Sequence, residues 1–129
     1  MEFKIDTNDN YTVISPVSER LDENLTEALF KKWTELVKTG VNNIIVDINP
    51  CSSADEQVMG SLVKLHESFY NEGHSIVFTN LQRGVKELLQ KHESFHDINI
   101  APTIDEAIDI ISMEMLERDL LNEEEGEDA

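Results

Sequence analysis

The sequence predicts an α/β fold with a mostly parallel or mixed sheet of about four or five strands, an N-terminal hairpin and about four helices. The main observation is that β-branched runs at 43–48 and 75–79 are each followed by a longer stretch with apolar residues at helical spacing. This alternation is typical of right-handed crossovers between parallel strands. Apolar residues on either side of the turn-forming cluster Thr7–Asn10 predict the hairpin, which adds an antiparallel element.

The helices follow from apolar periodicity and from glycines that suit helix ends. Between Leu25 and Val37, apolar residues recur at i, i+3, i+4 and i+8, and Gly40 favours the left-handed conformation in which many helices end. Gly73 is placed in the same way after the second helix. The expected order is β-β-α-β-α-β-α-β-α, with helices at 25–37, about 56–72, 81–91 and from Asp105 onward, and a short strand around Ile98.

Length and composition indicate one domain. A chain of 129 residues, of which 40% are hydrophobic, is sufficient for one modest core. The single cysteine, Cys51, excludes an intrachain disulfide, and the N-terminus lacks the basic stretch and apolar core of a signal peptide. No apolar run approaches the roughly 20 residues that cross a bilayer. We therefore expect a cytoplasmic protein without direct membrane insertion.

The charge distribution limits the classes of partner. A formal net charge of −17 repels nucleic acid phosphates and anionic lipids, so we expect no nucleic acid partner. Residues 114–129 contain eight acidic side chains and one basic side chain, Arg118. We expect residues 1–116 to form the folded domain and residues 117–129 to be an acidic, disordered tail, because residues 122–129 offer nothing apolar to bury. A basic partner surface is the functional alternative for this tail.

The segment from Asp47 to Gly60 is the most informative part of the chain. It connects the run 43–48 to the second helix and ends in the sequence Asp55-Glu-Gln-Val-Met-Gly60. This loop resembles the STAS domain of bacterial anti-sigma factor antagonists, in which a strand ending in Asp leads to an Asp-Ser-Ser/Thr-Gly-Leu-Gly motif whose first Ser is phosphorylated by a partner kinase. Asp47, Asp55 and Gly60 fit this pattern, and Glu56 stands in the position of the phosphorylated Ser.

Other segments agree with the resemblance, which covers the chain from about Phe3 to Ile111. The sequence Arg20-Leu-Asp is similar to the family's Gly-Arg-Leu-Asp turn, with Glu19 in place of the Gly. Asn80 follows the fourth strand, as it does in the family. The motif that carries the switch chemistry is therefore the part that departs most from the family pattern.

The resemblance implies a protein-interaction module that regulates transcription by binding a kinase-like anti-sigma factor. The sequence has no Gly-rich phosphate loop, no Gly-x-Ser-x-Gly elbow, no Cys-x-x-Cys and no nucleotide fingerprint, so we expect no enzymatic activity and no cofactor. Occupying that partner would free a sigma factor, and the charge of the loop would set the affinity. The alternative is a STAS subunit of a larger transporter or sensory complex, which needs no phosphorylation switch, and a homodimer stays open. The expected partner-binding residues are Asp55, Glu56, Gln57, Met59 and Gly60, and the candidate phosphoacceptors are Ser52 and Ser53.

The serines and Glu56 also have structural interpretations. Ser53-Ala-Asp-Glu56 fits a capping box, in which the Ser hydroxyl and the Glu carboxylate each bond a free amide at the start of a helix. Serines in a turn before a helix are often simple caps. An acidic residue there also interacts favourably with the helix dipole.

Cys51 and the histidines have no clear catalytic or metal-binding pattern. Cys51 follows a proline at a strand end, so a partly buried apolar role is the better interpretation than a nucleophile. His92 and His96 have i, i+4 spacing, but Phe95 indicates that the helix ends before His96. Without a shared helix face, we expect no metal site.

The last helix carries two apolar stripes. The first, which should pack on the domain, consists of Ile104, Ala107, Ile108, Ile111 and Met115. The second consists of Met113, Leu116 and Leu120 at i, i+3 and i+7. Such a helix near a chain end often contacts a partner or a second copy. The alternative is a helix that folds back entirely on the sheet.

Overall fold

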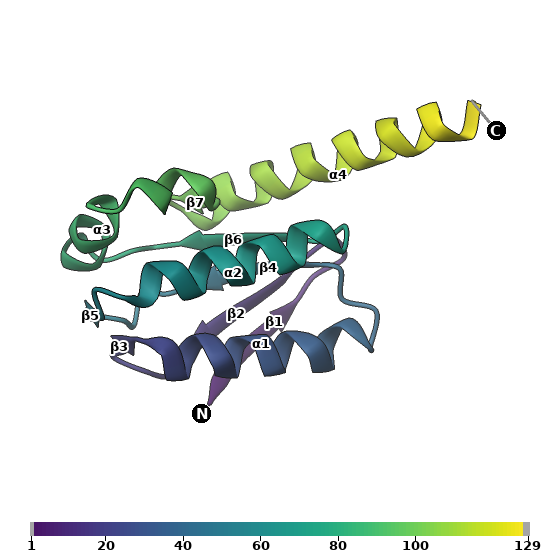
Figure 1. The fold of residues 1–129 in the computed structure, drawn as a ribbon. Helices are drawn as coiled ribbons and strands as arrows, with labels where there is room; N and C mark the ends of the chain where they lie inside the picture. Colours follow the sequence, from purple (N-terminus) through teal and green to yellow (C-terminus); the bar gives the residue numbers. More distant parts are fainter. Residues whose placement is uncertain (1, 128–129) are drawn as a thin grey trace.

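The computed structural model describes residues 2–127 and confirms the α/β architecture (Figure 1). Its main sheet has five strands in the order β1-β2-β4-β6-β7. The first pair, β1 (Phe3–Thr7) and β2 (Thr12–Pro16), forms the expected antiparallel hairpin. All further pairs are parallel, and they add β4 (Asn43–Asp47), β6 (Ser75–Thr79) and β7 (Ile100–Ala101).

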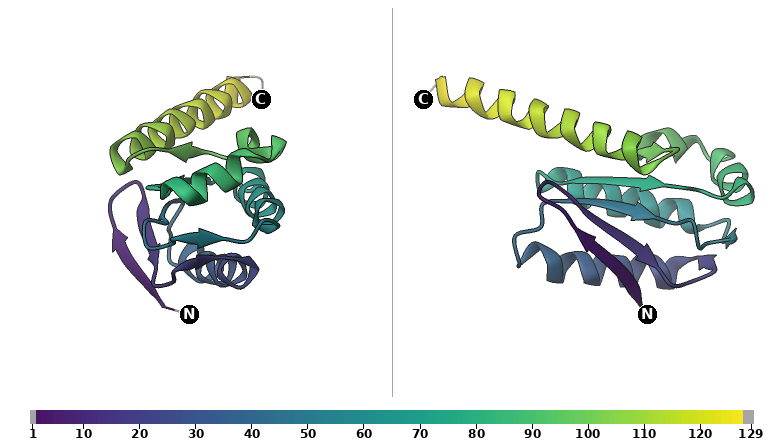
Figure 2. Two further views of the ribbon diagram at one scale, coloured as in Figure 1. Left: turned by 90° about the vertical axis from the view of Figure 1, so that its left-hand side faces the viewer. Right: turned by 180° about the vertical axis from the view of Figure 1, so that it is seen from behind.

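Helices cover both faces of this sheet (Figures 1 and 2). One face carries α1 (Glu23–Val37), α2 (Val58–Asn71) and α3 (Arg83–Gln90). The opposite face carries α4 (Ile104–Glu127), and a short 3-10 helix, η1 (Glu93–Asp97), leads from α3 toward β7. This arrangement of helices explains why the central strands read as continuous apolar runs.

Alternate residues of the central strands divide the apolar side chains into two cores. Ile44 and Val46 of β4 belong to the larger core beneath α1 and α2, whereas Ile45 belongs to the smaller core beneath α4. Within the larger core, the rings of Trp33 and Phe69 stack with centroids 4.0 Å apart and join α1 to α2. The sheet is therefore a rigid base for the loops at its edges.

Residues with the usual helix-end conformations and contacts lie at the ends of α1 and α2. Asp22 Oδ1 accepts a hydrogen bond of 2.9 Å from the backbone N–H of Leu25 and so caps α1. Gly40 has φ +95° and Gly73 has φ +81°, the left-handed conformations expected of glycine just after a helix. Both predicted helix stops are confirmed.

Three features of the strand and loop regions differ from the sequence-based expectation. A second, two-stranded parallel sheet pairs β3 (Arg20–Leu21) with β5 (Ser53–Ala54) and was not expected. The second helix begins at Val58 and not at 56, because residues 56 and 57 form a turn between β5 and the helix. The strand expected around Ile98 lies at 100–101, and Ile98 packs instead in the larger core.

Helix α4 continues to Glu127, where we expected a disordered tail from residue 117. Arg118 anchors this part of the chain, because its guanidinium donates hydrogen bonds to Ser75 Oγ at 2.9 Å and to Asn43 Oδ1 at 3.1 Å. Both acceptors are buried at the starts of β6 and β4. The folded domain therefore extends past residue 116, and residues 128–129 of the expected tail lie outside the described residues.

The two apolar stripes of α4 lie in different surroundings. Ala107 and Ile111 of the first stripe are buried in the smaller core, as predicted. Met113, Leu116 and Leu120 of the second stripe are exposed, so the alternative of a helix folded back entirely on the sheet is wrong. Within residues 2–127, no helix combines the length and apolar character needed to span a membrane.

Candidate functional site

The candidate site begins at the carboxyl ends of β4 and β6. Asp47 Oδ1 accepts hydrogen bonds from the backbone N–H of Asn49 at 3.0 Å and from Asn80 Nδ2 at 3.2 Å. Gln82 Nε2 donates to the carbonyl oxygen of Asn49 at 2.6 Å. Asn80 has φ +59°, a left-handed conformation that Asn tolerates better than most residues. These contacts fix the first part of the loop that leads to α2.

The small β3–β5 sheet fixes the rest of this loop. The backbone N–H groups of Ser52 and Ser53 donate to the carbonyl oxygen of Glu19, at 2.8 and 3.2 Å, and the N–H of Asp55 donates to that of Leu21 at 2.9 Å. The side chain of Arg20 forms an ion pair with Asp55. The turn before α1 and the loop before α2, which sequence analysis treated separately, are therefore one structural unit.

Glu56 is exposed in the turn between β5 and α2. Helix α2 has Gln57 as its N-cap residue, with no side-chain hydrogen bond to the cap. The predicted capping box is wrong, because Ser53 pairs with Arg20 in the small sheet and so cannot cap a helix that begins at Val58. Glu56 is therefore not part of a capping box, and its exposed side chain is accessible to a partner.

Glu56 lines an open acidic depression at the amino ends of α1 and α2. The depression measures about 520 Å³, and four of its six lining residues are acidic. The amino ends of helices stabilise such negative charges through the helix dipole. This surface suits a positively charged group of a partner. The lining residues are Asp22, Glu23, Asn24, Asp55, Glu56 and Gln57.

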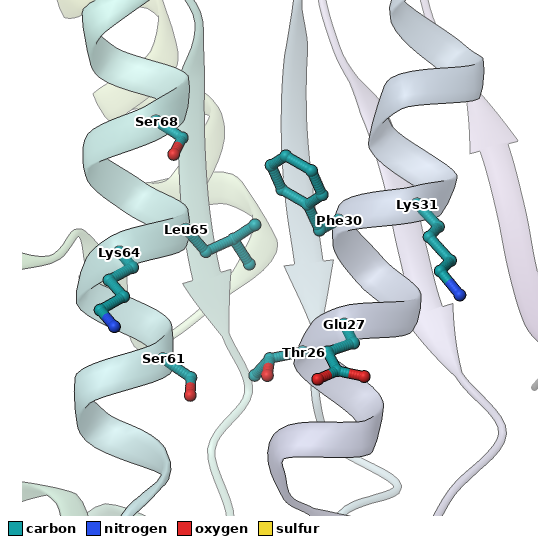
Figure 3. A pocket seen from close by; sticks show the side chains of 8 residues that line it. All are labelled: Thr26, Glu27, Phe30, Lys31, Ser61, Lys64, Leu65 and Ser68. Carbon is teal, nitrogen blue, oxygen red and sulfur yellow. The ribbon is translucent and has the colours of Figure 1, made fainter.

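A groove of about 320 Å³ runs between α1 and α2 from the same end of the two helices (Figure 3). Phe30 and Leu65 point toward each other across it, and Phe30 is 48% exposed. Thr26 and Ser61 place hydroxyl groups at the end of the groove that lies nearer to the loop. The groove therefore combines an apolar centre with polar edges. Its other lining residues are Glu27, Lys31, Lys64 and Ser68.

Residues 2–107 match the family model for the STAS domain. The chain belongs to the STAS domain family. No curated protein sequence matches the chain significantly. The fold also matches solved structures. A candidate anti-sigma factor antagonist from Thermotoga maritima is 22% identical, with a TM-score of 0.67, and the match covers 85% of this chain and 94% of that one.

Two further structures with this fold have different roles. The anti-sigma factor antagonist SpoIIAA of Bacillus, in its unphosphorylated form, is 19% identical, with a TM-score of 0.63 and coverage of 86% of this chain and 96% of SpoIIAA. The murine anion transporter Slc26a9 is 18% identical, with a TM-score of 0.64, and the match covers 84% of this chain but 18% of the transporter. At these identities, the likeness shows the shared STAS fold.

The structure separates the expected partner-binding residues of this STAS domain into two groups. Glu56 and Gln57 are exposed, and Asp55 is partly exposed beside Arg20. Gly60 is exposed in the first turn of α2, with nothing within 4 Å of the position that a Cβ atom would take. Met59 is only 2% exposed and packs in the larger core, so its expected role as a contact residue is wrong.

The candidate phosphoacceptors lie on the accessible side of the loop. Ser52 and Ser53 are both exposed. Ser52 Oγ donates to the carbonyl oxygen of Glu19 at 3.4 Å, whereas Ser53 belongs to β5. Neither serine caps α2, so their interpretation as caps is wrong. Their role as phosphoacceptors stays a prediction.

Cys51 is fully buried in the larger core. Its Sγ donates to the carbonyl oxygen of Ser18 at 3.4 Å, and burial, together with the negative charge of Asp22, raises the pKa of the thiol to about 11. These surroundings confirm the apolar interpretation of Cys51, because nucleophilic chemistry needs the thiolate. His92 precedes η1 and His96 lies within it, so the two rings do not share an α-helix face.

Proposed function

We propose that this STAS domain is a protein-interaction module that acts as an anti-sigma factor antagonist. It binds a kinase-like anti-sigma factor and thereby regulates transcription. The observation that carries the proposal is the exposed Glu56 on a loop that the β3–β5 sheet holds in place. Membership of the STAS family and the likeness to SpoIIAA support it.

The proposed contact surface has a charged part and an apolar part. The charged part consists of Asp55, Glu56 and Gln57 at the acidic depression, with Gly60 allowing close approach. The apolar part is the α1–α2 groove, where a partner side chain can cover the exposed ring of Phe30. Interfaces commonly combine an apolar anchor with polar contacts that fix orientation.

Glu56 gives this surface a constant charge. A phosphoserine carries about −1.5 to −2 charge and three acceptor oxygens, so one carboxylate with two oxygens is a weak substitute for it. A neutral serine lacks the charge altogether. The charge that Glu56 gives the loop therefore lies between the charge of a serine and that of a phosphoserine. A kinase cannot change this charge at position 56. Any phosphate regulation of this loop falls to Ser52 or Ser53.

The proposal is tested by titrating the purified chain with a cognate kinase-like anti-sigma factor in a calorimeter. Glu56→Gln removes the charge and keeps the shape, and we expect the affinity to fall several-fold, because a charge at the centre of an interface is lost. Glu72→Gln, at the opposite end of α2, is the matched control and should leave the affinity within twofold. Equal affinities of the wild type and Glu56→Gln would contradict the proposed contact.

Phosphate mapping tests the regulatory part. The chain is incubated with the same partner and ATP, and its peptides are analysed by mass spectrometry. We expect position 56 to stay unmodified, and any phosphate to lie on Ser52 or Ser53. Stoichiometric phosphate elsewhere in the chain would show that another surface is regulated.

The second candidate function is a fixed subunit of a larger transporter or sensory complex. The match to Slc26a9, in which the corresponding region is 18% of the chain, favours this alternative. A fixed subunit needs no phosphorylation switch, so the constant charge of Glu56 is compatible with such an assembly. Co-purification with a transporter polypeptide in detergent would support the subunit, and co-purification with a kinase-like ATPase domain would support the antagonist.

A further inference from the structure

The outward face of α4 carries an apolar stripe that none of residues 2–127 covers. Its members, Met113, Leu116 and Leu120, are 62%, 60% and 52% exposed. Their spacing of i, i+3 and i+7 is that of the a and d positions in a coiled-coil seam. The opposite face of the same helix is already packed on the sheet through Ala107 and Ile111. The helix therefore has apolar residues available for a second, external contact.

The position of α4 holds this stripe away from the proposed loop site. The helix lies on the sheet face opposite to α1 and α2 and extends past the end of the sheet (Figures 1 and 2). Hydrogen bonds from Arg118 to Ser75 and Asn43 fix its rotation, so the stripe faces outward. A partner bound at the loop would leave the stripe uncovered.

The charges beside the stripe indicate what occupies it. With Met113 at an a position, the flanking e and g positions are held by Glu117 and Asp119, and both side chains are exposed. Arg118 is the only basic residue in the sequence from 104 to 127, and it is turned toward the sheet. No positive charge of α4 therefore accompanies the stripe.

A second copy of this chain fits the stripe poorly. Antiparallel pairing of two α4 helices would place Glu117 opposite Glu117 and Asp119 opposite Asp119, and parallel pairing would also bring the acidic flanks together. Like charges across a seam are unfavourable, and the net charge of −17 adds long-range repulsion between copies. We propose that the Met113–Leu116–Leu120 stripe docks an amphipathic helix of another protein, with apolar seam residues and basic flanking residues.

Two synthetic helical peptides test this proposal with the full chain. Both carry Leu at a and d positions, and they differ at e and g positions, which are Lys in one peptide and Glu in the other. Fluorescence anisotropy at moderate salt should show the Lys peptide binding at least tenfold more tightly than the Glu peptide. Binding of neither peptide, or equal binding of both, would overturn the proposal.

Variants of the stripe separate docking from general attraction to an acidic protein. The double variant Leu116→Ser/Leu120→Ser should weaken binding of the Lys peptide at least tenfold, whereas Val17→Ser, at an exposed apolar residue outside both proposed surfaces, should not change it. The double variant Glu117→Lys/Asp119→Lys should transfer the preference to the Glu peptide. Undiminished binding by the Leu116→Ser/Leu120→Ser variant would reveal non-specific attraction and overturn the proposal.

Sedimentation velocity of the chain alone tests whether a second copy of the chain occupies the stripe instead. We expect a monomer at micromolar concentration, for the wild type as for Leu116→Ser/Leu120→Ser. A wild-type dimer that this variant disperses would assign the stripe to a second copy and overturn the proposal. The proposal does not rest on the loop site, so these results are independent of the Glu56→Gln titration.

Discussion

Replacing Leu21 with Ala should destabilise the domain far more than replacing its neighbour Arg20. Leu21 in β3 is 0% exposed within the larger core, and removing a buried Leu side chain costs about 2–5 kcal/mol of unfolding free energy. The Arg20–Asp55 pair lies at the surface, with side chains 58% and 37% exposed, and such pairs contribute at most about 1 kcal/mol. Apolar packing, and not the ion pair, should therefore hold the loop of the site in place.

Urea unfolding followed by circular dichroism measures both effects under the same conditions. Leu121→Ala is the matched control, because Leu121 is 58% exposed and its truncation should change the free energy by no more than about 0.5 kcal/mol. An unchanged m-value would show that the comparison concerns the folded state. If Arg20→Ala cost as much as Leu21→Ala, the ion pair would be the anchor and the reasoning would be refuted.

Three other predictions concern buried groups and the C-terminal helix. Cys51, buried and with a pKa of about 11, should react slowly with iodoacetamide at neutral pH and rapidly in urea, and fast native labelling would contradict its burial. Burial lowers the pKa of His66 from its ordinary value of 6.5, against the opposing charges of Glu114 and Glu67, so the unfolded chain binds a proton more readily than the folded one. Stability is therefore lost as the pH falls below about 6.5, down to the folded-state pKa. His66→Gln should reduce this dependence on pH in urea titrations, and equal slopes for His66→Gln and the wild type would contradict the assignment. Deleting residues 123–129 should leave the unfolding free energy nearly unchanged. Deleting residues 117–129 removes the hydrogen bonds from Arg118 to buried Ser75 and Asn43, so it should lower the unfolding free energy by about 1–3 kcal/mol. Equal effects of the two deletions would show that Arg118 is not the anchor of this helix.

The elements that sequence analysis located well are those whose signal is local. The run 43–48 has three successive β-branched apolar residues, Ile44, Ile45 and Val46, because both faces of β4 are covered, and the structure places the strand at 43–47. Gly40 and Gly73 end their helices in the conformation that only glycine adopts easily. In each case, a few neighbouring residues carry the whole signal.

The features that were missed depend on contacts between distant segments. Strands of two residues, such as β3 and β5, have no periodicity of their own, and the backbone bonds from Ser52 and Asp55 to the turn before α1 hold them together. Residues 117–129 were expected to be disordered because residues 122–129 offer nothing apolar to bury, yet Arg118 is anchored by polar contacts with Ser75 and Asn43. Pattern analysis of a single segment cannot detect such partners.

Met59 illustrates why a motif does not identify a contact surface. It lies within the aligned loop motif, between exposed Gln57 and exposed Gly60, but α2 has already begun at Val58 and its first turn directs Met59 into the core. The motif fixes the position of Glu56 in sequence, whereas the helix start decides which neighbouring side chains reach a partner. Only the backbone geometry therefore shows which side chains near Glu56 can reach a partner.

The acidic charge of the chain contributes to the affinity of the two proposed surfaces for basic partners, but it does not determine their specificity. A net charge of −17 attracts any basic protein and accelerates encounters, an effect that salt weakens within a Debye length of about 8–10 Å. Such a field cannot distinguish one basic partner from another. Discrimination must therefore come from the short-range apolar contacts, Phe30 beside the loop and Leu116 on α4, whose contribution salt leaves largely unchanged. Apolar variants at each site should thus lower affinity at high and low salt alike, while Glu56→Gln should act mainly at low salt.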